Sequence, residues 1–218
     1  MCASGQQADV ALADLKAGNP GLYALYESLP QYREQLEGYA DLQGFRGPHE
    51  RLATVIHELV HITSLMHQGY FIDGVYYEPY LAAGAWPDIS NKDVQEAMAK
   101  YGGLIYNGYV LGAPENRLGN VLDEINAYGH VAGFVCAHDA QAGAKQVENL
   151  LGMLRLQEVF LERSRVSGKG YKVLRSPGAS RGALLLITQR AVTALKACGV
   201  PSEQIPSAEV ARLTSGRS

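Results

Sequence analysis

Apolar residues recur at intervals of three and four positions along most of the chain, which is the spacing of one face of an α-helix. In the first part of the chain this spacing predicts short helices at residues 10–18, 22–29 and 32–39. Pro and Gly residues separate these segments, because Pro cannot donate a backbone hydrogen bond inside a helix. Later in the chain the same spacing predicts helices at residues 90–111, 114–140, 142–165 and 182–198. Residues 166–180, rich in Gly and Ser, are expected to form an exposed loop.

The longest uninterrupted apolar pattern begins after Gly47-Pro48 and runs from Leu52 to Leu65. Pro favours the first position of a helix, and Glu50 places negative charge at the positive end of that helix. Gly69 is the expected C-cap. Because the apolar set is wider than one stripe, we expect this helix to be buried on most sides.

One segment changes to the pattern of a β-hairpin. β-prone triplets at residues 70–72 and 75–77 flank Asp73-Gly74, a dipeptide typical of a two-residue hairpin turn. The expected fold is therefore mainly α, a single helical domain with one small β-hairpin (α+β). Within it we distinguish an N-terminal helical segment, a core segment and C-terminal helices, at residues 1–46, 47–140 and 141–218.

Composition limits the class of protein. The chain has 218 residues, of which 47% are hydrophobic and 19% charged, and its formal net charge is −3. This length fits one domain whose core needs no disulfide or metal merely to fold. The charge balance gives no electrostatic basis for nucleic-acid binding. The longest apolar run, at residues 183–187, is far shorter than the roughly 18 residues that a membrane-spanning helix needs.

The motif that carries chemistry is HELVH at residues 57–61, an HExxH sequence. On a helix His57 and His61 are four positions apart, so both imidazoles leave the same face and can bind one metal ion, expected to be Zn²⁺. Glu58 lies about 100° round the helix from His57 and can reach a water on that ion without binding the ion itself. Burying these groups among apolar neighbours is costly unless they are satisfied, and a metal satisfies all three.

A catalytic zinc site normally has three protein ligands. His67 has the spacing of the longer motif HExxHxxGxxH, but Ser64 replaces the Gly that lets the chain turn. If the helix continues to Met66, His67 points about 240° away from His61, and we expect it to be solvated. Glu124 is the expected third ligand, because it lies on a mostly apolar helical face where an unpaired carboxylate is costly.

Other assignments around Glu124 stay open at this stage. Asp123 is expected on the more polar flank of the same helix, and Glu124 itself could form a salt bridge with Arg117 instead of binding a metal. The remaining candidates for the third ligand are Glu78, Glu115 and His130.

The pattern resembles the zincin metallopeptidases of the gluzincin type, which have HExxH on one helix and a Glu on a later one. The resemblance covers residues 57–61 and 123–128, which are two helices and not the whole chain. The zinc ligands that it implies are His57, His61 and Glu124. It also implies that Glu58 is the general base. In the thermolysin-like branch the Glu helix follows much sooner and carries an Asp four positions later, where this chain has Tyr128, so the resemblance does not fix a subfamily.

The expected activity is that of a zinc metallopeptidase, in which Glu58 takes a proton from a metal-bound water. The oxyanion that forms needs a second donor besides zinc. Tyr128, four positions after Glu124 on the same helical face, is the expected catalytic donor. The competing side chains are Tyr80, Tyr106, Tyr109 and His130. The alternative role for the tyrosine-rich residues 70–80 is to line a cleft for a protein or peptide substrate, with the strand edge offering backbone hydrogen bonds to an extended chain.

Two alternatives to a metallopeptidase stay open. One is a catalytically inactive, zincin-like binding or scaffold protein, which the intact Glu58 disfavours because a structural site needs no base. The other is a zinc hydrolase of non-peptide bonds, since bond specificity depends on the shape of the pocket.

The cysteines bear on location. Cys2, Cys136 and Cys198 show no CxxC spacing, which disfavours a thiolate zinc site. A Cys136–Cys198 disulfide and two separate buried thiols are equally open. The sequence around Cys2 resembles a bacterial lipoprotein after removal of its signal, which predicts a lipid tether and a location in the cell envelope, periplasm or outside the cell. An ordinary cytoplasmic start is the alternative, and the sequence does not indicate an oligomeric state.

Overall fold

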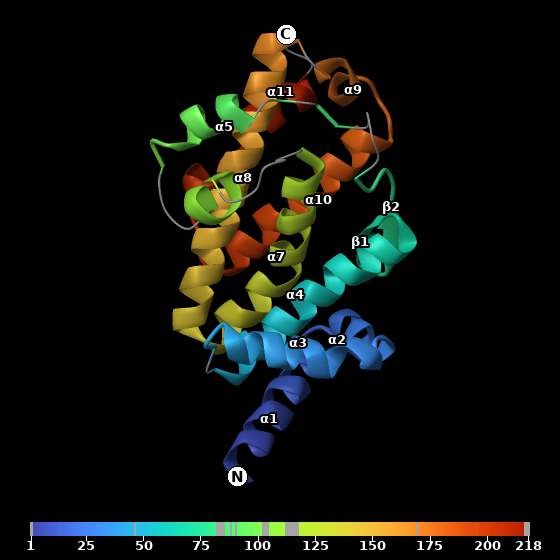
Figure 1. Ribbon diagram of the computed structural model, residues 1–218, viewed down its shortest axis with the longest axis vertical. Coiled ribbons are helices and arrows are strands. Elements are labelled where there is room, and N and C mark those ends of the chain that lie inside the picture. Colours follow the sequence, from blue (N-terminus) through green and yellow to red (C-terminus); the bar gives the residue numbers. More distant parts are fainter. Residues whose placement is uncertain are drawn as a thin grey trace.

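A computed structural model describes residues 2–45, 47–81, 86, 87, 89, 91–101, 105–111, 118–168 and 170–215, and for residues 2–7, 91 and 106 it describes the backbone alone. Over these residues the protein consists of helices and one two-stranded hairpin (Figure 1). This confirms the mainly α fold class with a small β-hairpin. None of the helices described is long and apolar enough to cross a bilayer.

The N-terminal part of the structure comprises α1 (Cys2–Gly18), α2 (Pro20–Ser28), α3 (Pro30–Leu42) and α4 (Pro48–His67). After the hairpin come α5 (Asn91–Met98), the π-helical turn η1 (Tyr106–Leu111), α7 (Leu118–His138) and α8 (Ala140–Ser167). The chain continues with α9 (Tyr171–Arg175), α10 (Ala179–Ala197), the 3₁₀ turn η2 (Ser202–Gln204) and α11 (Ala208–Ser215). Pro20, Pro30 and Pro48 each begin a helix, where the missing backbone N–H costs nothing.

The hairpin pairs β1 (Tyr70–Ile72) with β2 (Val75–Tyr77) in antiparallel register, with Tyr70 opposite Tyr77. Asp73 and Gly74 both have positive φ, 51° and 85°, as a primed two-residue turn requires. The hairpin predicted from Asp73-Gly74 is therefore present with the predicted strands.

Three local predictions are wrong. The helix predicted over residues 90–111 is interrupted, because α5 ends at Met98 and residues 99–101 form a turn. The C-cap of α4 is Gln68, with φ 51°, and not Gly69. Gly69 is needed for another reason, since a Cβ there would lie 2.9 Å from the Cβ of Tyr76 and would push the hairpin away from α4. Residues 166–180 are not one loop, because α9 lies within them and its Leu174 is fully buried in the core.

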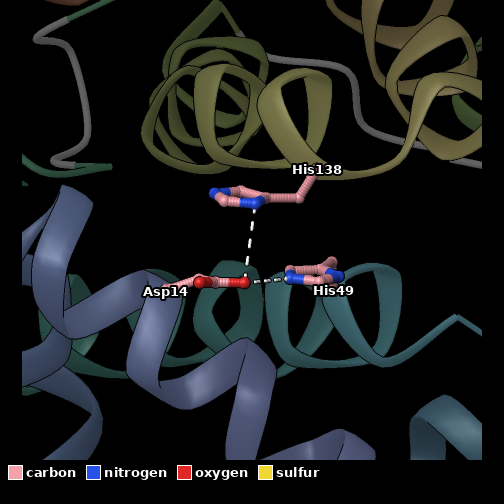
Figure 2. A group of neighbouring side chains, drawn as sticks. All are labelled: Asp14, His49 and His138. Atoms are coloured by element: carbon pink, nitrogen blue, oxygen red, sulfur yellow. Dashed lines mark hydrogen bonds and ion pairs between the residues drawn. The ribbon is translucent and has the colours of Figure 1, made fainter.

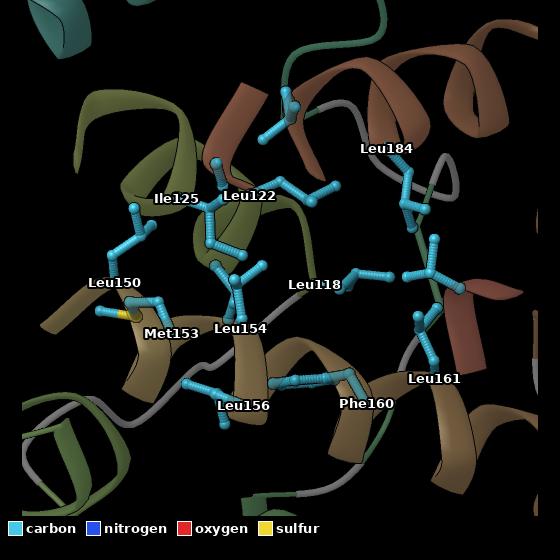
Figure 3. Packing of buried hydrophobic residues seen from close by; sticks show 14 of the residues in the cluster. Leu118, Leu122, Ile125, Leu150, Met153, Leu154, Leu156, Phe160, Leu161 and Leu184 are labelled. Carbon is cyan, nitrogen blue, oxygen red and sulfur yellow. The ribbon is translucent and has the colours of Figure 1, made fainter. Parts of the chain in front are cut away.

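The helix α7 is the centre of the fold, and it packs against α4, α8 and α10 (Figure 1). The larger hydrophobic cluster fills the space between α7, α8 and α10 (Figure 3). A smaller cluster joins α1, α2 and α4 to the other side of α7. A disulfide between Cys136 and Cys198 links α7 to the end of α10. These contacts hold α7 on several sides, so the side chains that it presents to α4 have little freedom to move.

The contact between α7 and α8 predicts opposite effects for two Gly→Ala substitutions. A Cβ on Gly143 would lie 2.9 Å from Cα of Cys136, whereas a Cβ on Gly133 would meet nothing within 4 Å. Ala normally stabilises a helix interior by up to about 1 kcal/mol relative to Gly, and we expect this gain for G133A. We expect G143A to lower the free energy of unfolding by about 1–3 kcal/mol, because the backbone of α7 must shift. Urea denaturation of both variants checks this, and equal effects would contradict the close packing.

Candidate metal centre

Three potential ligand atoms meet where α4 crosses α7. Nε2 of His57 and Nε2 of His61 lie 3.1 Å apart, because residues four apart share one face of α4. Oε2 of Glu124, on α7, lies 3.4 Å from Nε2 of His57 and 3.8 Å from Nε2 of His61. The structure thus brings together the three residues expected from the sequence as metal ligands.

The separations of these atoms fit a zinc site. Imidazole nitrogens and carboxylate oxygens bind Zn²⁺ at about 2.0–2.1 Å in tetrahedral geometry, which places pairs of ligand atoms about 3.3 Å apart. The three observed separations, 3.1, 3.4 and 3.8 Å, lie on both sides of this value. A metal ion would satisfy both facing imidazole nitrogens and the carboxylate oxygen at once, whereas without a metal a proton on one of the nitrogens links them by hydrogen bonds.

A second carboxylate holds His61 in place. Oδ2 of Asp123 lies 2.7 Å from Nδ1 of His61, and the hydroxyl of Tyr80 donates to the same oxygen at 3.0 Å. A carboxylate on the far nitrogen of a histidine fixes the ring and its tautomer, leaving Nε2 free for a metal. Asp123 is buried, at 7% exposure, so the expectation that it lies on a polar flank is wrong. A metal-binding His usually has a hydrogen-bond partner on its other ring nitrogen, and this rule could have pointed to Asp123 from the sequence.

The charges at this site favour bound cations. Burial lowers the pKa of His61, but its hydrogen bond to Asp123 and the charges of Asp123, Glu124 and Glu58 outweigh burial and raise the pKa to about 9. Burial of Glu124 raises its pKa, but the nearby His57 and His61 outweigh burial and hold it below its usual value. Glu124 therefore stays ionised, as a metal ligand must.

Glu58 lies beside this group and lines a cavity of about 440 Å³ together with His61 and Glu124. The apolar side chains that line the same cavity are those of Leu81, Val121, Met153 and Leu156. A volume of this size lies within the range of small-molecule binding sites. The cavity can therefore admit part of a substrate to the side of the site on which Glu58 lies.

Two tyrosine hydroxyls, those of Tyr109 and Tyr128, lie near Glu124. The hydroxyl of Tyr109 donates to Oε2 of Glu124 at 3.4 Å and lies 3.4 Å from the hydroxyl of Tyr128. Asn149 donates to the hydroxyl of Tyr128 at 3.5 Å, and the ring of Tyr128 packs edge-on against His57. Burial is the main cause that raises the pKa of both tyrosines, that of Tyr128 to about 12. Both phenols stay protonated and able to donate.

Of these two tyrosines, Tyr109 lines the cavity with Glu58, a placement that periodicity alone could not reveal. Tyr39 of α3 also interacts electrostatically with the carboxylates of the site. The sequence had suggested no role for it there. Its pKa is raised by partial burial and by the charges of Glu58 and Glu124. The catalytic role expected for Tyr128 stays a prediction.

Several candidates lie elsewhere. His67 is exposed and stacks on the ring of Tyr76, with centroids 4.0 Å apart. Glu78 is exposed and lies outside the group of ligand atoms. The candidates Glu115 and Arg117, and the side chains of Tyr106 and Cys2, lie outside the described residues.

His130 is also separate from the ligand group. Its Nδ1 donates to the carbonyl oxygen of Asn126 at 2.7 Å, its ring stacks on Phe71, and Nε2 is buried without a hydrogen-bond partner in the described structure. Burial, with the charge of Arg190, lowers its pKa to about 3.

This burial of His130 predicts a loss of stability in acid. An unfolded His takes up a proton near pH 6.5, whereas folded His130 does so only near pH 3. Between these values protons bind preferentially to the unfolded chain, so stability is present above pH 6.5 and falls as the pH is lowered, by up to about 1.4 kcal/mol per pH unit. H130N keeps a donor near Nδ1 but does not titrate. The free energy of unfolding of H130N should therefore fall less steeply with pH than that of the wild type, and parallel curves would refute the assignment.

Comparisons of the chain with protein-family models, with curated proteins and with solved structures found no match. The resemblance to zincins therefore rests on the residues of the site alone.

Proposed function

We propose that the protein is a zinc-dependent hydrolase, and specifically a metallopeptidase. Its zinc ligands would be His57, His61 and Glu124, and Glu58 would be its general base. The observation that carries the proposal is the convergence of three ligand atoms, 3.1–3.8 Å apart, beside a cavity that Glu58 lines. A purely structural zinc site would be closed by protein ligands and would need neither a cavity nor a base.

Each side chain has a distinct task in this proposal. Zinc, when bound, would supply a Lewis acid that makes water more acidic and polarises a carbonyl group. The carboxylate of Glu58 would accept a proton from the attacking water and pass it to the leaving amine. Asp123 would hold His61 in the required tautomer through the 2.7 Å hydrogen bond at Nδ1.

The tyrosines would contribute hydrogen bonds to developing negative charge. Tyr109 lines the cavity, and Tyr128 and Asn149 continue the chain of hydrogen bonds behind it. The single hydroxyl proton of Tyr109 is directed at Glu124 across 3.4 Å, and it would turn from Glu124 to an oxyanion in the cavity. Tyr109 is therefore the better placed donor, and Tyr128 would orient it.

The cavity also supports a substrate class. The cavity is lined by Leu81, Val121, Met153 and Leu156 as well as by the acidic and imidazole groups. A peptide with an apolar side chain next to the scissile bond would bury that side chain there, at about 25 cal/mol per Å² of apolar surface. The disulfide between Cys136 and Cys198 supports activity in an oxidising compartment, such as the cell envelope or the outside of the cell.

The ligand assignment predicts that E124A loses zinc. Removing a ligand from a three-residue site should weaken binding by more than the roughly 10–100-fold that loss of an outer hydrogen-bond partner costs. H67A is the matched control, because His67 ends the same helix that carries the HExxH motif but is exposed and away from the site. Zinc titration of both metal-free variants checks this. The opposite pattern would move the assignment to His67.

The role of Glu58 predicts that E58Q binds zinc but is inactive. Gln keeps the shape of the side chain and cannot accept the proton, so we expect kcat to fall by about 10²–10⁴ with zinc affinity within a few-fold of the wild type. Hydrolysis of a peptide library rich in apolar residues, measured with bound zinc, provides the readout. A wild-type protein that binds zinc yet cleaves no peptide would reject the metallopeptidase and leave the two alternatives, a binding protein and a hydrolase of non-peptide bonds.

The arrangement of the tyrosines predicts that Y109F costs more activity than Y128F. Tyr109 faces the cavity, so losing its hydroxyl should lower kcat by about 10²–10³. Y128F removes only the hydroxyl behind it and should lower kcat about tenfold or less. The kcat and KM of both variants, at equal zinc occupancy, test this order. A larger loss in Y128F would make Tyr128 the donor, as first expected from the sequence.

A further inference from the structure

A second group of metal-ligand side chains lies at the ends of three helices. Asp14 comes from α1, His49 is the second residue of α4, and His138 is the last residue of α7 (Figure 2). Oδ2 of Asp14 lies 2.9 Å from Nε2 of His49 and 3.5 Å from Nδ1 of His138. His49 precedes His57 by two helical turns, about 12 Å along α4, so this group is separate from the first.

The donor set suits a transition metal. Two imidazoles and a carboxylate are ligands typical of Zn²⁺ and of neighbouring divalent ions such as Ni²⁺. The separations of 2.9 and 3.5 Å again lie on both sides of the roughly 3.3 Å expected between ligands of a tetrahedral zinc ion. Oδ2 of Asp14 therefore lies at a distance from each histidine nitrogen that is typical of two ligand atoms on one zinc ion.

The imidazole rings of His49 and His138 are packed against their neighbours, but the ring of His138 can rotate. The rings of His49 and His138 are parallel within 3° (Figure 2), and both pack against Phe134. Parallel stacked rings cannot both direct an in-plane nitrogen lone pair at one ion. His138 can turn out of the stack, because its side chain is 31% exposed and it ends its helix.

We propose that Asp14, His49 and His138 bind a second zinc-class divalent ion that joins α1 to the ends of α4 and α7. Within the smaller hydrophobic cluster, Leu15 of α1 packs next to this site. A metal ion would add a strong link from the N-terminal helix to two core helices. Because metal binds the folded arrangement and not the unfolded chain, it would stabilise the protein. Its role is structural, and it does not depend on the proposed hydrolase activity.

The test counts zinc ions. Metal-free wild-type protein titrated with Zn²⁺ should take up two equivalents, and H138A should take up one. H67A, which removes an exposed histidine from the end of another helix, should still take up two. D14N, which keeps the size of the side chain but not its charge, should weaken the second equivalent at least about tenfold. The proposal would be overturned if the wild-type protein bound its second zinc ion no more tightly than H138A binds a second zinc ion.

A second measurement separates the two sites. E124A, in which the first site is disabled, should still bind one equivalent and melt at a higher temperature with Zn²⁺ than without it. The double variant E124A/H138A should show neither effect. If Zn²⁺ fails to stabilise folded E124A, the second site does not exist, whatever the first site does. Failure of the first metal site would instead appear as a missing equivalent in H138A, which carries only that site. Failure of the hydrolase activity alone would leave both zinc counts unchanged.

Discussion

The packing of α4 against α7 depends on four ionisable side chains that lie together between the two helices, of which His57 and Asp123 are buried and His61 and Glu124 partly buried. His61 has Asp123 at one ring nitrogen, at 2.7 Å, and faces His57 and Glu124 with the other. Each group would be costly to bury alone, and each makes the burial of its neighbours tolerable. Removing one member therefore costs more than its own contacts, because the remaining charges lose their partner. A cation at the centre, either a proton or a metal ion, completes the balance.

The fold provides the rigidity that this arrangement needs. Helix α7 carries both Asp123 and Glu124 and is held by α4, α8 and α10, and by the disulfide at Cys136. Consecutive residues on a helix point about 100° apart, so Asp123 and Glu124 can approach His61 and the pair of Nε2 atoms from different sides. Tyr80, which follows the hairpin in the chain, donates a hydrogen bond to Asp123 from outside the two helices. The position of the site thus follows from the packing of a few long helices.

Some of this could be predicted from the sequence, and some could not. The HExxH spacing and the cost of a carboxylate on an apolar face pointed to His57, His61 and Glu124, because both arguments are local to one helix. The hairpin followed from Asp73-Gly74, whose turn chemistry is also local. Asp123 was wrongly assigned to the polar flank of its helix. The periodicity of apolar residues tells which residues share a face of a helix, but not which neighbouring helix packs against that face. The short helix α9 was missed because the burial of Leu174 depends on tertiary packing.

The same His-Glu dipeptide occurs twice on α4, and its surroundings determine what each copy can do. Glu58, after His57, lines the cavity beside the ligand atoms. Glu50, after His49, is 9% exposed and forms an ion pair with Lys145 at 3.2 Å. Under the proposals above, a metal at the first group would act with Glu58 as its base, whereas a metal at the second group would join helices. The two copies thus share a dipeptide but differ in their surroundings, because α7 places Glu124 near His57 whereas α8 places Lys145 near Glu50.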